Sequence, residues 1–281
     1  MLLRETLAAA GMIPPAELVP GRWLRFPGIG KGRSNRSGWC RIISPTLAIY
    51  GDWSANLSAV WKDDTHRDDK ETARQLEDAR RREREFARAQ RAKQEEVARD
   101  AQTLIRQAKF GVHPYLARKG FPGTSGLIYG TRLAIPMRDT CRYLEPVINV
   151  QLIAEDGTKR FMTGGRAGGA VYILGPRSSR HTVLCEGYAT GLTVEAALKL
   201  LPGPNRVVVC FSAMNLERVA PLYPGAVIAA DNDRSATGQH AAQATGLKWT
   251  MPYEVGTDFN DLHQRQGLMP VIEMMRALVC P

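Results

Sequence analysis

The stretch that decides the fold is residues 181–233, which read HTVLCEGYATGLTVEAALKLLPGPNRVVVCFSAMNLERVAPLYPGAVIAADND. Short apolar runs alternate in it with longer helical patterns, and glycine or proline stands at several of the junctions. We expect three strands, at 182–185, 206–211 and 226–230. Two helices, at 189–201 and 215–222, lie between them, and a further helix at 238–245 and a candidate fourth strand at 248–251 follow. Strands that alternate with helices in units this short predict a parallel sheet covered by helices.

Acidic residues follow two of these strands directly. Glu186 comes after the first strand, and Asp231 and Asp233 come after the third. In an open parallel sheet, ligands bind where the carboxyl ends of the strands meet the loops to the next helices. The side chains at positions i and i+2 of an extended segment point the same way, so Asp231 and Asp233 can share a cation.

A lone Asp-x-Asp is more often a turn or a helix cap. A glutamate at the end of one strand together with Asp-x-Asp at the end of another instead favours a magnesium site, since Mg²⁺ prefers a few carboxylates plus water and phosphate oxygens. A further acidic segment, Asp258–Asp261, follows the last expected strand and can add ligands from the side.

The motifs resemble a known family. Four segments are similar to TOPRIM primases of phages and plasmids: Glu186–Thr190, Asn215-Leu216, Ala230–Asp233 and Asp258–Leu262. TOPRIM is the module shared by DnaG-type primases, type IA and type II topoisomerases and some nucleases. Three upstream segments resemble the basic lobe that precedes TOPRIM in these primases: His113–Gly120, Ile135–Met137 and Asp156–Phe161. The resemblance covers about residues 110–265 and extends only loosely to the N-terminal third.

The resemblance implies a DNA primase, which makes short RNA primers on single-stranded DNA from nucleoside triphosphates with two Mg²⁺ or Mn²⁺ ions, in phage or plasmid replication. Glu186, Asp231 and Asp233 are then the catalytic and metal-binding acids, with Asp258 and Asp261 as supporting metal ligands. The residues expected to bind nucleotide or template are Arg118, Lys119, Arg132, Lys159, Arg160 and Arg166. Family members often carry a zinc-binding template reader or a fused helicase. We expect neither here, and so expect a separate replicative helicase as partner.

Three other functions compete with priming. A TOPRIM nuclease uses similar acids and metal ions to attack a phosphodiester with water. A topoisomerase needs a tyrosine nucleophile on a further large domain, for which the chain has little room. An accessory protein that only binds DNA would not need the acids. The lobe from residue 113 to 172 favours the primase, because a small nuclease has no obvious task for it.

The predicted fold class is α/β, with a TOPRIM parallel sheet preceded by a mixed α+β basic lobe and a helical and β-rich N-terminal region. We divide the chain into a small β-rich region, a charged helical segment without glycine or proline, the basic lobe, the TOPRIM domain and a C-terminal helix: 1–61, 62–109, 110–180, 181–265 and 266–281.

Charge and cysteines limit the class of protein. The formal net charge is +10, and Lys+Arg minus Asp+Glu is 7−3, 14−12, 10−4 and 7−9 for residues 1–61, 62–109, 110–180 and 181–281, so the basic excess is N-terminal. Such a distribution suits a polyanion held by one region and metal ions by the other. Five scattered cysteines without a C-x-x-C pair encode neither a zinc ribbon nor a disulfide framework. Such cysteines fit the reducing cytoplasm of a bacterial host cell best. With no apolar run near ~20 residues, we expect no membrane partner.

The N-terminal region mixes tryptophans with arginines. Trp23, Trp39, Trp53 and Trp61 lie among Arg22, Arg25, Arg33, Arg36 and Arg41. Such a mixture can stack single-stranded bases, or the tryptophans can form the core of a small β unit, which we favour for at least half of them. Gly28–Gly32 resembles a phosphate loop without matching G-x-x-x-x-G-K-[ST], so we interpret it as a basic turn.

Overall fold

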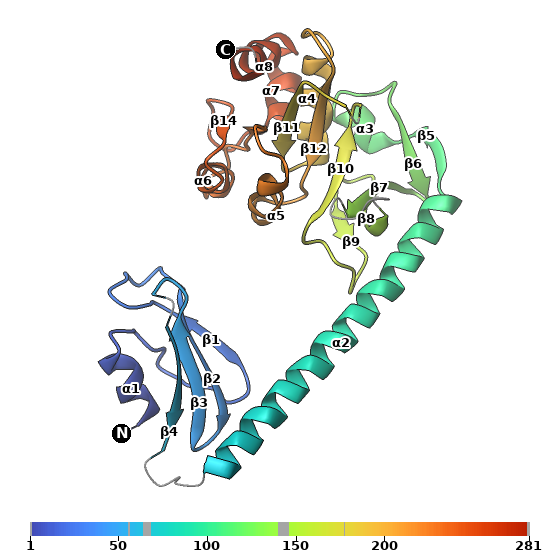
Figure 1. Cartoon of the computed structure of the whole chain (residues 1–281). Coiled ribbons are helices and arrows are strands. Elements are labelled where there is room, and N and C mark those ends of the chain that lie inside the picture. Colours follow the sequence, from blue (N-terminus) through green and yellow to red (C-terminus); the bar gives the residue numbers. More distant parts are fainter. Residues whose placement is uncertain (1, 56, 64–68, 140–145, 177, 280–281) are drawn as a thin grey trace. The chain divides into compact units, whose positions relative to one another are not determined.

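The computed structural model describes residues 2–55, 57–63, 69–139, 146–176 and 178–279. These residues form two compact units, Met1–Ala89 and Gln90–Pro281 (Figure 1). The helix α2 (Asp69–Gln107) contributes to both. Two of the cysteines noted above, Cys141 and Cys280, lie outside the described residues, whereas Cys40, Cys185 and Cys210 are buried free thiols.

The N-terminal unit is a four-stranded antiparallel sheet with one covering helix. Its elements in chain order are α1 (Leu3–Ala9), β1 (Trp23–Phe26), β2 (Gly38–Ser44), β3 (Leu47–Asp52) and β4 (Leu57–Lys62), and the strands are adjacent in that order. Because side chains alternate along a strand, Cys40 and Ile42 face the core with Leu7, whereas Trp39 and Arg41 face the other way. Trp61 belongs to the same core.

The glycine-rich turn of this unit wraps around an acid of the protein itself. The backbone N–H of Ile29 donates to Asp52 Oδ2 at 2.7 Å. A Cβ on Gly28 would lie 2.2 Å from the same Oδ2, so only glycine permits this approach. Gly30 has φ +64°, which is accessible to glycine without strain. Gly28–Gly32 is therefore the turn expected from the sequence, and its Ile29 N–H serves a carboxylate.

The charged segment forms one helix of 39 residues, α2. Near its start, Gln75 accepts a hydrogen bond from Ser44 Oγ, and Glu83 pairs with Arg41 at 3.4 Å. Near its end, Ala101 and Leu104 pack on the sheet of the second unit with Ala134 and Val150.

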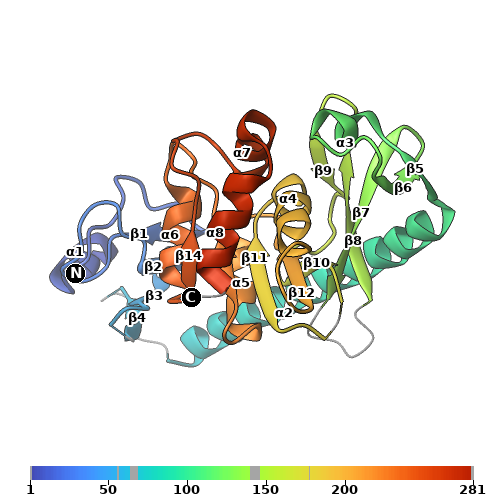
Figure 2. The ribbon, with the colours of Figure 1, turned by 90° about the horizontal axis from the view of Figure 1, so that it is seen from above.

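The C-terminal unit is built on one ten-stranded sheet. Its strands are β5 (Lys109–Val112), β6 (Ser125–Tyr129), β7 (Arg132–Asp139), β8 (Val147–Ile153), β9 (Lys159–Phe161), β10 (Ala170–Leu174), β11 (His181–Cys185), β12 (Asn205–Val209), β13 (Val227–Ala229) and β14 (Lys248–Thr250). The order along the sheet is β14-β13-β11-β12-β10-β7-β6-β5, and β8 extends from β7 and carries β9 (Figure 2). Its helices are α3 (Pro114–Arg118), α4 (Tyr188–Leu198), α5 (Ala213–Val219), η1 (Ala220–Leu222), α6 (Thr237–Ala244), α7 (Phe259–Gln266) and α8 (Met269–Val279).

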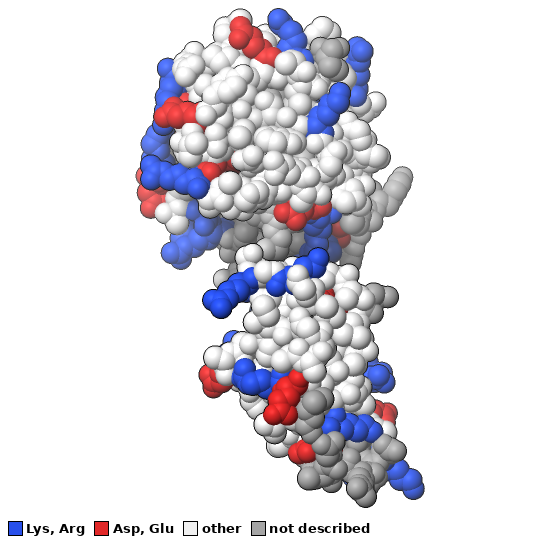
Figure 3. Space-filling view, turned by 90° about the vertical axis from the view of Figure 1, so that its left-hand side faces the viewer, with Lys and Arg blue, Asp and Glu red and all other residues white. Residues whose placement is uncertain are grey.

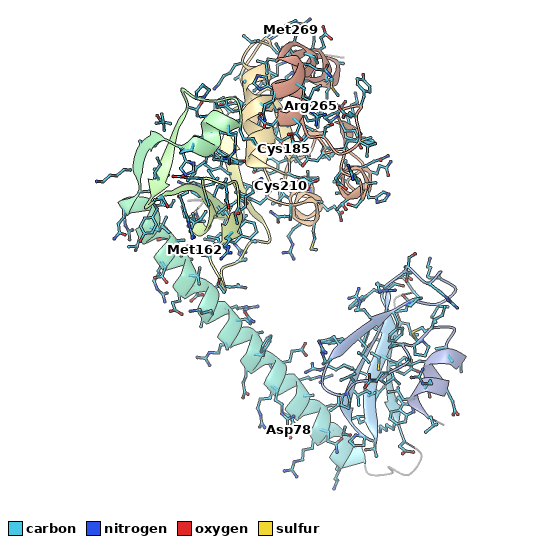
Figure 4. The ribbon with its side chains drawn as sticks, turned by 180° about the vertical axis from the view of Figure 1, so that it is seen from behind. Asp78, Met162, Cys185, Cys210, Arg265 and Met269 are labelled. Carbon is cyan, nitrogen blue, oxygen red and sulfur yellow. The ribbon has the colours of Figure 1, made fainter. Side chains whose placement is uncertain are left out.

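The predicted parallel sheet covered by helices is confirmed. Strands β14, β13, β11 and β12 are parallel, and each face carries its own hydrophobic cluster. On one face Val183 and Val207 pack with Leu198 of α4 and Met275 of α8; on the other, Leu184 packs with residues of α5 and α6. Figure 4 shows Cys185 and Cys210 inside this unit, at the ends of β11 and β12. Helices therefore pack on both faces of the parallel strands whose carboxyl ends precede the predicted acids.

Two of the details that differ from the sequence prediction lie in or beside the parallel sheet. Strand β10, which pairs antiparallel with both β12 and β7 and joins the lobe to the parallel sheet, was not predicted. The helix expected at 215–222 begins at Ala213 and gives way at Ala220 to a 3-10 turn. Pro221 lies in that turn, where its missing N–H cannot continue the α-helical hydrogen bonds.

Within the described residues no helix is long and apolar enough to cross a membrane. On the face shown in Figure 3, acidic and basic side chains are interspersed. On that face, the basic excess of the N-terminal part of the sequence does not form one continuous basic patch.

Candidate functional site

Two acidic positions emerge side by side from the parallel sheet. Cys185 of β11 is paired with Ala229 of β13, so the residues that follow, Glu186 and the Asp231 segment, leave the sheet at the same edge. The chain passes from β11 to β12 on one side, while β13 lies on the other side. This arrangement is a topological switch point, where open α/β sheets bind their ligands.

Glu186 presents a buried oxygen that has no donor. Its Oε1 is shielded from solvent and has no hydrogen-bond partner among the described residues. A Cβ on Gly238 would come within 2.9 Å of this oxygen and 2.5 Å of the Asp231 carbonyl oxygen, so a glycine is required there. Burial and the charge of Asp233 raise the pKa of Glu186, against the Ala213 N–H that lowers it. A buried acceptor without a donor is costly, and a bound cation would satisfy it.

Asp231 is also in a setting that disfavours its charge. Burial, then Asp258 and Glu186, raise its pKa to about 8, and Lys159 and Thr190 oppose the change. Thr190 Oγ1 donates to Asp231 Oδ1 at 3.4 Å. At neutral pH this carboxyl group therefore keeps its proton unless positive charge is added beside it.

Asp233 caps the helix that follows it. Its Oδ1 accepts from the N–H groups of Ser235 and Thr237 at 2.8 and 3.1 Å, and its Oδ2 accepts from the Gly238 N–H at 2.9 Å. These donors, with the Ser235 hydroxyl first among them, lower its pKa to about 2. The cap that a lone Asp-x-Asp predicts is thus present, and it fixes a charged carboxylate next to Glu186.

Asn232, between the two aspartates, binds the loop that leads to Asp258. Its N–H donates to Thr257 O at 3.1 Å, and its Nδ2 donates to Pro252 O at 2.9 Å. The side chain is buried, and its hydrogen bond directs it to this loop. These two hydrogen bonds hold the loop that contains Asp258 beside Asp231.

Asp258 and Asp261 form the capping box of α7. Asp258 Oδ1 accepts from the Asp261 N–H at 2.8 Å, and Asp261 Oδ2 accepts from the Asp258 N–H at 3.3 Å. Lys119 Nζ lies 3.7 Å from Asp261 Oδ1. Of the two, Asp258 is the one that influences Asp231.

The basic residues of β9 point to opposite sides of their strand. Lys159 lies on the side of the acids: desolvation and Lys119 lower its pKa, whereas Asp258 and Asp231 raise it. Arg160 instead lines a pocket of about 230 Å³ with Arg132, Leu152, Ala154, Asp156 and Thr158. The pairing explains this difference, because Lys159 is opposite Ile153, which packs with α3 and α4, and Arg160 is opposite Leu152, which packs with α2.

Two of the predicted basic residues remain, Arg166 and Arg118. Arg166 forms an ion pair with the buried carboxylate of Asp139. Arg118 lies at the end of α3, near Gly157. The structure thus brings Lys119 and Lys159 to the acids and leaves Arg132, Arg160 and Arg166 outside this group.

Sequence reasoning assigned no role to several polar residues that hold the site. Asn215 accepts from the Gly169 N–H at 2.6 Å and donates to Ala170 O and Cys210 O, both at 2.7 Å. Asn260 donates to Lys119 O at 2.8 Å and to Thr193 Oγ1 at 3.1 Å. Both asparagines lie within motifs that resemble the TOPRIM primases, which was the available signal. They join the lobe to the parallel sheet.

No group of three or more His, Cys, Asp or Glu side chains within the described residues is arranged to hold a metal ion as it stands. The acids nevertheless fit a divalent cation of the magnesium type, which needs only one or two carboxylates and completes its shell with water and phosphate oxygens. The observation that supports the fit is the buried Glu186 Oε1 without a donor, next to the Asp231 backbone.

Comparison with known proteins identifies the parallel-sheet region. Residues 181–268 match the family model described as Toprim domain, which confirms the TOPRIM resemblance. Enzymes with this domain generally depend on a divalent metal ion. The match includes all five of the acids discussed above.

Two relatives are DNA primases. The chain is 31% identical over 192 residues to a DNA primase TraC of Escherichia coli, covering 60% of this chain and 17% of the relative. A second DNA primase TraC of the same organism is 31% identical over 163 residues, covering 50% of this chain and 11% of the relative. The chain therefore spans less than a fifth of the length of these relatives.

Two solved structures are similar at low identity. One is the primase fragment of the bacteriophage T7 primase-helicase protein, at 15% identity and TM-score 0.39, covering 51% of this chain and 62% of the other. The other is a DnaG primase catalytic domain bound to single-stranded DNA, at 14% identity and TM-score 0.35, covering 54% and 55%.

Proposed function

We propose that this chain is a DNA primase that joins ribonucleotides on a single-stranded DNA template, in phage or plasmid replication. The observation that carries the proposal is the buried, donor-free Glu186 Oε1 beside Asp231 at the carboxyl ends of adjacent Toprim strands. The sequence similarity to the TraC primases supports the choice of reaction. The bacterial cytoplasm and a separate replicative helicase belong to the same proposal.

In this proposal Glu186, Asp231 and Asp233 hold divalent metal ions, two Mg²⁺ or Mn²⁺, and Asp258 supports them from the side. Asp261 acts through Asp258, whose position it fixes in the capping box. Bound metal ions supply charge stabilisation for the attacking and leaving oxygens of an in-line displacement at the α-phosphate. Lys159 pairs with the triphosphate in this proposal, which is supported by the influence of Asp258 and Asp231 on its pKa.

The competing function is a Toprim nuclease, which needs similar acids. The lobe favours polymerisation: its strands are continuous with the parallel sheet through β10, and Lys159 reaches from it towards the acids. Such a lobe gives a triphosphate a basic side and the metal ions an acidic side. Hydrolysis of a phosphodiester by water does not require the basic side.

The test is a primer-synthesis assay with single-stranded DNA, labelled nucleoside triphosphates and Mg²⁺. We expect short labelled products from the wild type and none from Asp231→Ala plus Asp233→Ala. The loss should be about 10² or more in rate, since each removed ligand withdraws several kcal/mol of transition-state stabilisation. Degraded template without a new strand would identify the nuclease. Retained DNA binding with neither product would identify an accessory protein.

A further inference from the structure

One face of the N-terminal sheet is not covered by α1. The register places Trp23 and Arg25 of β1 opposite Arg41 and Trp39 of β2, so these four side chains share a face. The core residues Cys40 and Ile42 occupy the opposite face with α1. We call the face of Trp23, Arg25, Trp39 and Arg41, together with Trp53, the tryptophan face.

The three tryptophans of this face form a continuous row. The ring centroids of Trp23 and Trp39 are 5.4 Å apart, and those of Trp39 and Trp53 are 5.8 Å apart. Trp39 is buried in the middle, whereas Trp23 and Trp53 are 45% and 54% exposed. Two large rings therefore present open surface at the two ends of the row, an arrangement unlike that of a closed core.

The backbone below the row is shaped for the central ring. A Cβ on Gly51 would lie 2.5 Å from the Trp39 ring, so glycine at this position lets the indole lie against the sheet. The Trp39 Nε1–H is buried and has no acceptor among the described residues. A buried donor without a partner is uncommon. Because Trp39 lies between the two exposed tryptophans, an oxygen atom of a ligand bound to them can accept a hydrogen bond from it.

Cations surround the row. The Arg25 guanidinium lies 3.7 Å from the centroid of Trp53, and that of Arg41 lies 5.6 Å from the centroid of Trp23. Arg41 also pairs with Glu83 at 3.4 Å. Residues 18–51 contain six basic residues (Arg22, Arg25, Lys31, Arg33, Arg36 and Arg41) and no Asp or Glu. The face thus combines aromatic rings with positive charge, which is the combination that holds single-stranded nucleic acid.

We propose that the tryptophan face binds single-stranded DNA, with bases stacked on Trp23 and Trp53 and phosphates held by the surrounding arginines. A double helix keeps its bases stacked inside, so the open ring surfaces would have no partner in duplex DNA. The choice of DNA over RNA rests on the proposed priming function; the choice of a single strand rests on the face alone. The site lies in a different unit from the Toprim acids and gives the chain a second contact with a template.

The test measures binding of the full-length protein to labelled oligo(dT) by fluorescence anisotropy, in EDTA and without nucleotides, so that no reaction occurs. Trp23→Ala plus Trp53→Ala should raise Kd by about tenfold or more, because each lost base stack is a substantial part of the affinity. Its salt dependence should stay unchanged. Arg25→Gln should instead lower the slope of log K against log salt by about 0.7, the value for one phosphate contact on a single strand.

Matched variants separate stacking from general damage. Phe110→Ala removes an aromatic ring that is 79% exposed elsewhere in the chain and should leave Kd unchanged. Trp23→Phe plus Trp53→Phe should restore most of the affinity. Circular dichroism and thermal melting of each variant report whether it is folded.

The inference is overturned if the double alanine variant binds as tightly as Phe110→Ala, or if duplex DNA binds as well as oligo(dT). Tighter, tryptophan-dependent binding of oligo(rU) would overturn the assignment to DNA. Binding and priming measured on the wild type separate the two proposals, and the Asp231→Ala plus Asp233→Ala variant should keep the tryptophan-dependent binding. Tryptophan-dependent binding by a wild-type protein that never primes would refute only the proposed function. Normal priming by the wild type with tryptophan-independent binding would refute only this inference.

Discussion

Each of the two units contains an aspartate with little exposure to solvent. Hydrogen-bond donors surround the aspartate of the N-terminal unit, whereas other acids surround that of the C-terminal unit. In the N-terminal unit, Asp52 is fully buried, yet it accepts from the Ile29 N–H at 2.7 Å and from the N–H and Oγ of Ser54, both at 2.8 Å. In the C-terminal unit, Asp231 accepts one long hydrogen bond, from Thr190, and faces other acids.

The pKa values move in opposite directions as a result. Burial works to raise the pKa of Asp52, but donors from Ile29, Ser54 and Ser37 outweigh it and hold the pKa below its usual range. For Asp231, burial dominates and the pKa rises to about 8. The number of hydrogen-bond donors, more than burial, therefore separates Asp52, which holds a turn together, from Asp231, which we propose binds a cation.

The largest effect that can test this contrast is on catalysis. Glu186→Gln keeps the shape of the side chain and removes its charge, so we expect primer synthesis to fall by about 10² or more, with no loss of thermal stability, because the buried charge was unfavourable. Steady-state primer synthesis and melting curves measure the two results. Glu195→Gln on α4, whose partner is the exposed Lys199, is the matched control and should retain full activity. Equal activity of the two variants would contradict the site.

The next effect is on metal affinity. Because Asp231 binds a proton up to about pH 8, a metal ion must displace that proton below this pH. We expect the Mg²⁺ or Mn²⁺ association constant to rise about tenfold per pH unit and to level off above pH 8. Calorimetric titrations between pH 6 and 9 measure the slope.

Two substitutions distinguish the source of that slope. Asp231→Asn should weaken metal binding and abolish its pH dependence. Asp233→Asn should weaken binding and keep the dependence, because the pKa of Asp233 is about 2 and this group does not titrate in the range. A slope that survives in Asp231→Asn would assign the proton to another group.

Much of the parallel-sheet region could be predicted because its signals are local. Apolar runs ending in an acid located the strand ends before Glu186 and Asp231, and glycine and proline marked the connections. The 3-10 turn at Pro221 had a signal too, which the helical pattern around it obscured. Strand β10 had none of comparable strength, because its five residues are defined by pairing with β7 and β12, which lie far from it in the sequence.

The arrangement of the site depended still more on distant pairing. Strand periodicity already implies that Lys159 and Arg160 point to opposite sides, but only the partners Ile153 and Leu152 show which side faces the acids. The hydrogen bonds of Asn232 to residues 252–257 could not be predicted from the sequence either, since an asparagine in a loop has many possible partners. Of the four N-terminal tryptophans, Trp61 and Trp39 are buried and Trp23 and Trp53 are not. The alternation of side chains along a strand does not predict this division unless the face of the sheet that the helix covers is known.

The smallest effects are on stability, and they should have opposite signs in the two units. The pKa of Asp52 is lowered in the folded state, so its stabilisation exists above its unfolded value near 4 and is lost as the pH falls through the folded value. The pKa of Asp231 is raised, so its contribution is complete below about pH 4 and is lost as the pH rises towards 8. At pH 8 without metal, Asp52→Asn should therefore melt several degrees below the wild type and Asp231→Asn a few degrees above it.

Scanning calorimetry from pH 4 to 9 measures both differences, with Glu17→Gln, an exposed acid of the N-terminal unit, as the variant that should change neither. Added Mg²⁺ sharpens the contrast, because a ligand that binds only the folded state raises the melting temperature of the wild type by mass action. The advantage of Asp231→Asn should then shrink or reverse, while the deficit of Asp52→Asn stays the same. If Mg²⁺ instead leaves the order of the wild type and Asp231→Asn unchanged at saturating concentration, the unfavourable charge of Asp231 is not the feature that a cation relieves.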